Sequence, residues 1–214
     1  MTKLHFDVLD KNRLDFWNKL GALSSFGAVL GGGTAIALQM GHRISRDFDI
    51  FVRREISPQL RKKVIGIIDH PYILELDNPE QLTLVSDSGT KITLLHYPFP
   101  PLHQLLKTDS LPLFHLLDLT SSKAYTIGRR GTWRDYVDIY FLLSKAGIGL
   151  KSVIDEAQHR FSNEFNPKLF LQQLTYTRDL GKFTIEPLHD KISPLQITGF
   201  FEKIAREYIK ENIL

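Results

Sequence analysis

The sequence predicts an α+β fold in which a mixed sheet with helices comes first and a mostly helical lobe follows. Short apolar stretches typical of strands mix with helical patterns up to about residue 100, and only helical patterns follow. Between the two parts lies the proline-rich sequence YPFPPL, residues 97–102, which interrupts regular structure. Because strands are confined to the first part, we expect two lobes, at residues 1–105 and 106–214.

The first lobe is predicted to contain three helices and five strands. Its helices are expected at residues 7–25, 34–40 and about 57–68. Its strands are expected at residues 28–30, 48–52, 72–76, 82–85 and 91–96. Gly41 is placed to stop the second helix, and Ser57 followed by Pro58 opens the third. The last two strands flank Asp87-Ser88-Gly89, which predicts a hairpin turn.

The second lobe is predicted to be helical throughout, because apolar residues recur there at helical spacing. Its helices are expected at residues 112–127, 132–146, 150–161, 167–175 and 194–212.

Composition narrows the class of protein. The 214 residues are 43% hydrophobic and 24% charged, which is ordinary for a globular protein with a buried core. No apolar run is long enough for a transmembrane helix, and the first residues lack the apolar core of a signal peptide. The absence of cysteine excludes thiolate metal sites and fits a cytoplasmic protein. A net charge of +3 and a pI of about 9.0 permit a nucleic-acid partner without requiring one.

Three consecutive glycines, Gly31, Gly32 and Gly33, separate the first predicted strand from the helix that follows. Because glycine has no Cβ atom, the backbone at this turn can approach a ligand closely. The amides at the start of a helix can in addition bind phosphate. Thr34 adds a hydroxyl donor. The alternative is a tight turn with Thr34 as the N-cap of the helix. No Gly-Lys-Ser/Thr follows, so this is not a Walker A loop.

Two aspartates, Asp47 and Asp49, lie two residues apart around the next predicted strand. Strand side chains alternate between faces, so both carboxylates share one face while Phe48 and Ile50 occupy the other. Two carboxylates suit Mg²⁺, which takes few protein ligands and keeps places for water and substrate phosphates. The alternative is a pair of solvated charges. The glycine turn just upstream makes the metal site the better interpretation.

Three positions in the helical lobe, Lys123, Asp135 and Asp138, have competing explanations. Lys123 falls beside an apolar helical stripe, where a lysine either extends to water or faces a ligand. Thr132 and Asp135 have the spacing of a capping box, although Asp is less common than Glu at its third position. Asp138, one turn later, either supports Asp135 or pairs with Arg134 at i, i+4.

The string GGGTAIALQMGHRISRDFDIF, residues 31–51, resembles the active-site signature of the DNA polymerase β nucleotidyltransferase superfamily. It is more specifically similar to the AbiEii-type nucleotidyltransferase toxins of bacterial toxin–antitoxin and abortive-infection pairs. The string SSKAYTIGRRGTWRDYVDIYFLL, residues 121–143, resembles that family's lysine-bearing helix followed by Arg-Asp-x-x-Asp. The matching motifs cover roughly residues 28–53 and 113–143.

The resemblance implies a nucleotidyltransferase head at residues 1–105 and a helical lobe at residues 106–214 that completes the active-site cleft. The implied catalytic residues are Asp47, Asp49, Lys123 and Asp135, with Asp47 and Asp49 as the ligands of Mg²⁺. The implied nucleotide-binding residues are Gly32, Gly33, Thr34, Arg43, Ser45 and Arg130. For Ser45 there are two alternatives: its hydroxyl is itself modified, or the residue only marks the start of the strand.

One position departs from the superfamily pattern. Many members carry a third carboxylate on a later strand, where it deprotonates the attacking hydroxyl. The strand at 91–96 is the corresponding place, and it offers Thr93. Either Asp135 takes that role, or water accepts the proton, or the enzyme is slow or inactive.

The sequence therefore predicts a Mg²⁺-dependent enzyme that transfers a nucleoside monophosphate from an NTP to an acceptor hydroxyl. The resemblance implies a toxin neutralised by an antitoxin protein, with a tRNA, a protein or the enzyme itself as acceptor, and no membrane partner. The first alternative is a catalytically degenerate nucleotide-binding module that serves as an interaction surface. A small-molecule transferase is a further alternative, which the basic pI disfavours.

Overall fold

The computed structural model describes residues 3–68, 71–189 and 191–212, with the side chain of Arg130 outside the description. The chain divides into two compact units, Met1–His115 and Leu116–Leu214. The first unit holds all the strands of the described residues in one sheet, and the second is helical. This confirms the α+β fold class and the segregation of strands into the first part of the chain.

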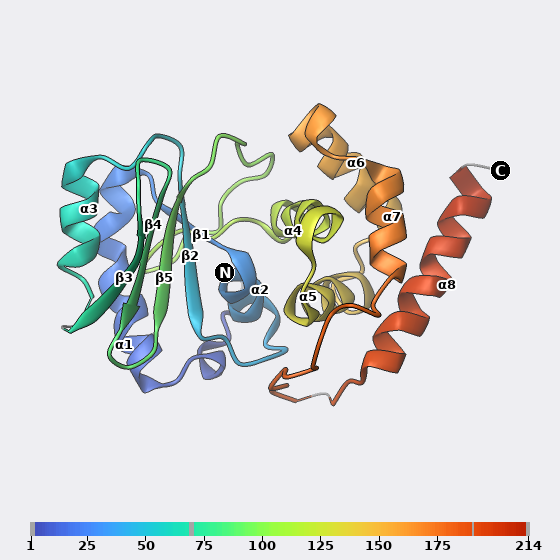
Figure 1. Ribbon diagram of the computed structural model, residues 1–214, viewed down its shortest axis with the longest axis horizontal. Coiled ribbons are helices and arrows are strands. Elements are labelled where there is room, and N and C mark those ends of the chain that lie inside the picture. Colours follow the sequence, from blue (N-terminus) through green and yellow to red (C-terminus); the bar gives the residue numbers. More distant parts are fainter. Residues whose placement is uncertain (1–2, 69–70, 190, 213–214) are drawn as a thin grey trace. The chain divides into compact units, whose positions relative to one another are not determined.

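The sheet of the first unit has five strands in the order β1-β2-β5-β4-β3 (Figure 1). Its strands are β1 (Val29–Gly31), β2 (Asp47–Val52), β3 (Tyr72–Asp77), β4 (Gln81–Ser86) and β5 (Lys91–His96). The central pair β2 and β5 is parallel, and the other neighbours are antiparallel. All five predicted strands are therefore present, and Gly89 adopts a left-handed φ of 74° in the predicted hairpin turn.

At the start of the first unit, the observed helices differ from the single helix predicted there. The helices of this unit are η1 (Phe6–Val8), α1 (Lys11–Leu20), η2 (Gly21–Phe26), α2 (Gly32–Met40) and α3 (Pro58–Ile65). The single helix predicted at 7–25 is wrong, because Leu9 is extended and Asp10 begins a new helix by accepting a hydrogen bond from the Arg13 N–H. The last part then tightens into a 3₁₀ helix and ends at Gly27, whose φ is 70°.

Alternation along β2 decides which face of the sheet is core. Phe48 and Ile50 are fully buried, and the Phe16 ring of α1 lies 5.9 Å from the Phe48 ring. Asp47 and Asp49 occupy the opposite face and are half-buried. Figure 1 shows α1 and α3 on one side of the sheet and α2 on the other. The two aspartates therefore share the α2 side.

The first helix of the second unit begins at Leu116, four residues later than the helix predicted from residue 112. The helices of this unit are α4 (Leu116–Arg130), α5 (Trp133–Ser144), α6 (Leu150–Phe161), η3 (Ser162–Glu164), α7 (Pro167–Thr175) and α8 (Pro194–Asn212). The helix predicted from residue 112 is wrong at its start, because the Phe114 N–H donates to the Leu30 carbonyl and Leu113 pairs with Leu106. These bonds keep residues 112–114 out of the helix.

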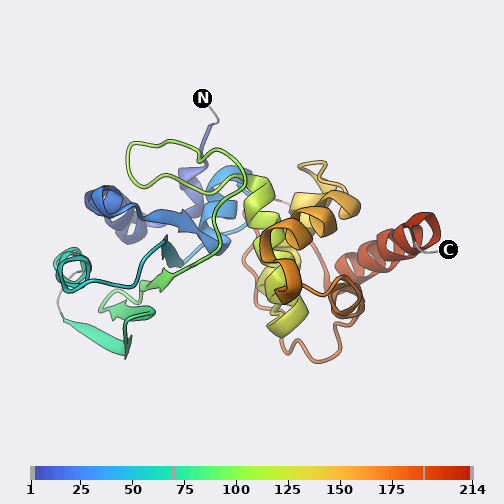
Figure 2. The same cartoon turned by 90° about the horizontal axis from the view of Figure 1, so that it is seen from above.

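Helix α4 is the central element of the second unit, since it packs against α5, α6 and α7. Helix α8, in red in Figures 1 and 2, lies at one edge of this unit and contacts α5, α6 and α7. None of the helices in the described part of the chain is long and apolar enough to cross a membrane.

Candidate active site

The glycine turn joins β1 directly to α2 and is shaped by the side chains around it. Gly32 has a left-handed φ of 61°, and an added Cβ atom there would lie 2.1 Å from Asp49 Oδ2. An added Cβ on Gly31 would lie 2.4 Å from the Phe51 ring. Close packing therefore favours glycine at both positions, and at Gly32 the left-handed backbone conformation favours it as well. Gly33 is half-buried in the first turn of α2.

The two aspartates of β2 lie beside this turn because of strand register. Asp49 is the partner of Gly31 on β1 and of Thr93 on β5, and Asp47 is the partner of Lys91. Side chains of paired residues share a face of the sheet. The side chain adjacent to Asp49 on β5 is therefore a threonine, and Thr93 is itself buried.

The donor set on this face fits a magnesium ion. Two carboxylates on one strand face supply oxygen ligands, and Gly32 leaves room for the Asp49 carboxylate at the start of α2. Among the described residues, no group of three or more His, Asp or Glu side chains could hold a metal ion. A two-carboxylate site matches an ion that takes its other ligands from water and substrate phosphates.

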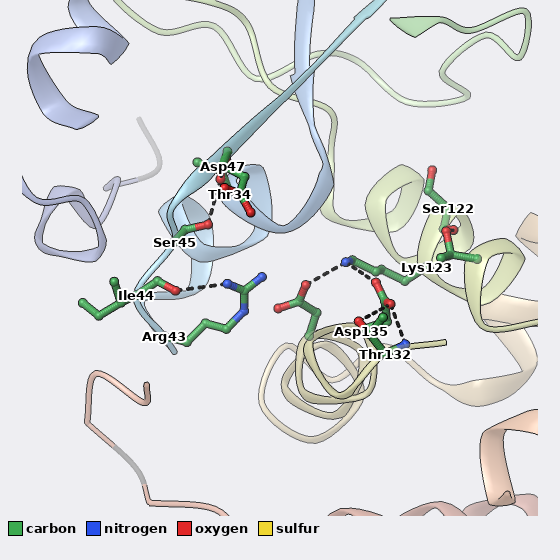
Figure 3. A network of polar contacts seen from close by, with 11 residues as sticks. Thr34, Arg43, Ile44, Ser45, Asp47, Ser122, Lys123, Thr132 and Asp135 are labelled. Atoms are coloured by element: carbon green, nitrogen blue, oxygen red, sulfur yellow. Dashed lines mark hydrogen bonds and ion pairs between the residues drawn. The ribbon is translucent and has the colours of Figure 1, made fainter. Parts of the chain in front are cut away.

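The hydroxyls of Thr34 and Ser45 are buried and bonded to each other (Figure 3). Their oxygens lie 2.7 Å apart, and the Thr34 hydroxyl also donates to the Asp47 carbonyl. Because a hydroxyl has one hydrogen, Ser45 must be the donor in the bond to Thr34. This chain of hydrogen bonds ties the first turn of α2 to the start of β2, which fixes Asp47 relative to the glycine turn.

Arg43 lies in the segment between α2 and β2 and is buried. Its Nη1 donates to the Ile44 carbonyl at 3.1 Å. This residue, like Thr34 and Ser45, therefore makes hydrogen bonds within the first unit.

The second unit contains its own charged cluster, built from α4 and α5. Lys123 Nζ lies 2.8 Å from Asp135 Oδ1 and 2.8 Å from Asp138 Oδ2. The Lys123 and Asp135 side chains are 11% and 12% exposed, and the Asp138 side chain is fully buried. Lys123 therefore does not extend to water, and Asp138 contacts Lys123.

Asp135 forms the capping box that its spacing from Thr132 predicts, and it also pairs with Lys123 (Figure 3). Its Oδ2 accepts hydrogen bonds from the Thr132 N–H at 2.9 Å and from the Thr132 hydroxyl at 2.7 Å, which caps α5. Its Oδ1 accepts the bond from Lys123. Burial, with the negative charges of Asp179 and Asp135, raises the pKa of the neighbouring Tyr136 hydroxyl well above its ordinary value of 10.0.

A second buried ion pair supports the start of α4, and sequence reasoning missed it. Arg160 of α6 and Asp118 of α4 have fully buried side chains, with 3.5 Å between Nη1 and Oδ1. Arg160 Nη1 also donates to the Asp118 carbonyl and to the hydroxyls of Ser121 and Ser122. These contacts fix the turn of α4 that precedes Lys123. Arg160 lies in the last turn of α6, where a basic residue is unremarkable, so no local pattern could have revealed the pair.

The expected site residues thus fall into two groups, one in each unit. The glycine turn and β2 bring together Gly32, Gly33, Thr34, Ser45, Asp47 and Asp49 in the first unit. Lys123 and Asp135 meet in the second unit. The backbone of Arg130 ends α4, and its side chain lies outside the described residues.

Comparisons with known proteins agree with this fold and these motifs. The family described as "Nucleotidyl transferase AbiEii toxin, Type IV TA system" matches residues 24–211. The protein aq_aa25 of Aquifex aeolicus (strain VF5) is 28% identical over 202 residues, covering 89% of this chain and 91% of that protein.

Two solved structures share the fold. The nucleotidyltransferase toxin MenT4 from Mycobacterium tuberculosis H37Rv superimposes with a TM-score of 0.58 at 15% identity, covering 95% of this chain and 82% of that one. JHP933 from Helicobacter pylori gives a TM-score of 0.55 at 14% identity, covering 95% and 96%. The family match spans most of the chain and includes both motif regions. This chain therefore belongs to the AbiEii family of nucleotidyltransferase toxins.

Proposed function

We propose that this nucleotidyltransferase moves a nucleoside monophosphate from an NTP to an acceptor hydroxyl, with Mg²⁺ held by Asp47 and Asp49. The observation that carries the proposal is the packing of the Asp49 carboxylate against Gly32, at the first residue of α2. The amides that begin α2 and the carboxylates of β2 thereby lie together. Amides at a helix start attract phosphate, and carboxylates bind the cation that accompanies it.

Each residue group has a distinct part in this chemistry. The amides of Gly32 and Gly33 bind phosphate oxygens, and the Thr34–Ser45 hydrogen bonds keep that turn fixed to β2. Bound Mg²⁺ would neutralise phosphate charge and help to align the reacting groups. Lys123, a protonated amine held between carboxylates, supplies positive charge for the nucleotide's phosphates.

The reaction forms a bond between the acceptor oxygen and the α-phosphorus and breaks the bond between the α- and β-phosphates. Pyrophosphate leaves, and the proton of the hydroxyl passes to a base. Thr93 has no carboxylate to act as that base beside Asp49. Asp135 is our candidate, because its carboxylate contacts Lys123 and lies in the sequence Arg-Asp-x-x-Asp, which resembles the family's second motif. Replacing Asp135 by Asn should then lower the transfer rate most at low pH, where hydroxide cannot substitute.

The acceptor is proposed to be RNA or protein, and the partner an antitoxin protein. Membership in a toxin family supports an antitoxin partner. The basic pI of about 9.0 favours an RNA acceptor, such as the 3′ end of a tRNA, over a cationic small molecule.

The test is label transfer from each of the four α-labelled NTPs in the presence of Mg²⁺ and either total tRNA or cell extract. Asp49→Asn should abolish transfer, because it removes a charged ligand without changing side-chain size. The matched control is Asp77→Asn on β3 of the same sheet, where the carboxylate pairs with Arg61 at 2.6 Å; this variant should retain activity. Nucleotide binding without label on any acceptor would instead favour a degenerate binding module.

A further inference from the structure

The geometry points to Asp138 as a positioning residue that fixes the amine of Lys123 for nucleotidyl transfer. This inference rests on the proposed function. Asp138 Oδ2 and Asp135 Oδ1 each lie 2.8 Å from Lys123 Nζ, so the amine is held from two sides. The two carboxylates lie three residues apart on α5, which places them on one face of that helix.

The two carboxylates differ in how they are held. Asp135 is 12% exposed, and its second oxygen is committed to capping Thr132. Asp138 is fully buried, between the buried residues Val137 and Ile139 in sequence. A buried carboxylate is costly unless a cation pairs with it, and Lys123 provides that cation. Asp138 is therefore a fixed anchor, whereas Asp135 lies nearer to solvent.

Fixing the amine has a consequence for the reaction. A lysine side chain has four rotatable bonds and loses considerable conformational entropy when it is ordered. Two carboxylates that order it in advance remove that cost from the catalytic step. With Asp138 as the buried anchor, Asp135 can change partner during the reaction while the Lys123 amine stays in place. The sequence spacing alone left Asp138 with Arg134 as an alternative partner.

A double-mutant cycle tests whether Asp138 acts through Lys123. Asp138→Asn should lower kcat by about 10²-fold, with the KM for NTP changed less than about threefold. In a Lys123→Met background, the same substitution should cause no further loss, because residues that act as a unit are not additive. A loss of equal size in both backgrounds, or full activity of Asp138→Asn, would overturn the proposal.

The matched control is Asp155→Asn, which removes the carboxylate of an exposed Lys–Asp pair in the same unit, with 2.6 Å between Lys151 and Asp155. This variant should keep wild-type kcat. Circular dichroism and thermal unfolding verify that each variant is folded.

A readout independent of activity follows the amine itself. Reductive methylation with formaldehyde and borohydride, quantified by mass spectrometry, should label Lys123 slowly in the wild type. Asp138→Asn should raise its labelling rate at least tenfold while Lys151 is unchanged. Asp135→Asn should keep the labelling rate of Lys123 within threefold of the wild-type rate, because Asp138 still holds the amine. This variant tests the proposal if Asp138→Asn does not fold. Labelling of Lys123 that rises in Asp135→Asn but not in Asp138→Asn would overturn the proposal.

The same measurements separate this inference from the proposed function. If the wild-type protein transfers no nucleotide with any NTP, the proposed function fails, whatever the labelling shows. If it transfers nucleotide and Asp138→Asn matches it in both kcat and labelling, the positioning role alone fails. Asp49→Asn should abolish transfer without changing the labelling of Lys123.

Discussion

Gly32 and Asp49 are packed so closely that a Cβ atom on Gly32 would lie 2.1 Å from Asp49 Oδ2 and 2.9 Å from Asp49 Cβ. They come from α2 and β2, and the antiparallel pairing of β1 with β2 brings them together. The absence of one side chain therefore sets the position of a proposed metal ligand.

Gly32→Ala should abolish nucleotidyl transfer, because the new methyl group displaces the Asp49 carboxylate. We expect a loss of at least about 10²-fold in kcat. The control is Gly89→Ala, since Gly89 also has a left-handed φ, of 74°, but no atom within 4 Å of an added Cβ. Both variants bear a backbone cost of about 1–2 kcal/mol, seen as a lower unfolding temperature. Equal activity of the two variants would contradict the close-packing argument.

Thr93→Asp should make the stability of the protein depend on Mg²⁺. The new carboxylate would lie beside Asp49, and two charges about 5 Å apart at an effective dielectric of about 20 repel by about 3 kcal/mol. We expect a lower unfolding temperature in EDTA and recovery with Mg²⁺, which relieves the repulsion. Thr83→Asp is the control, because Thr83 lies one strand further from Asp49. If Mg²⁺ stabilises both variants equally, the ion does not bind at Asp49.

Arg160→Met should destabilise the protein by about 3–5 kcal/mol, because it leaves the Asp118 carboxylate buried without this cation. Urea unfolding followed by circular dichroism measures the change in free energy. Lys151→Met breaks an exposed pair in the same unit, on the helix that also carries Arg160, and should unfold at the wild-type urea concentration. Similar urea midpoints of unfolding for the two variants would show that the buried pair contributes no more to stability than the exposed pair.

The raised pKa of Tyr136 should lower the free energy of unfolding as the pH rises above 10. Burial and the nearby carboxylates raise its pKa in the folded state, so the folded chain keeps a proton that the unfolded chain loses. The unfolded state therefore binds fewer protons above pH 10, and the free energy of unfolding falls.

Tyr136→Phe tests this sign. At pH 8 the variant should be less stable by about 1 kcal/mol, since it lacks the hydrogen bond to the Gln173 carbonyl. Between pH 10 and 11 the difference from the wild type should shrink, as measured by urea unfolding at each pH. A difference that stays constant over this range would contradict a raised pKa for Tyr136.

Local patterns in the sequence predicted most of the regular structure. Helices α6, α7 and α8 have the predicted bounds, because apolar spacing and start signals such as Asn166-Pro167 act over a few residues. The failures at residues 7–25 and 112–115 have a different origin. Asp10 divides the first helix by capping, and backbone bonds to Leu30 and Leu106 keep residues 112–114 out of the second helix.

The sequence by itself determined that Asp47 and Asp49 share one face of a strand and that a glycine turn precedes them, since both follow from spacing along a single segment. Tertiary structure decided which side chains those groups meet. Register between β2 and β5 placed Thr93 beside Asp49, and helix packing gave Lys123 two carboxylates and buried Arg160 against Asp118. Such contacts join segments far apart in the chain, so they depend on strand pairing and core packing, which no local pattern encodes.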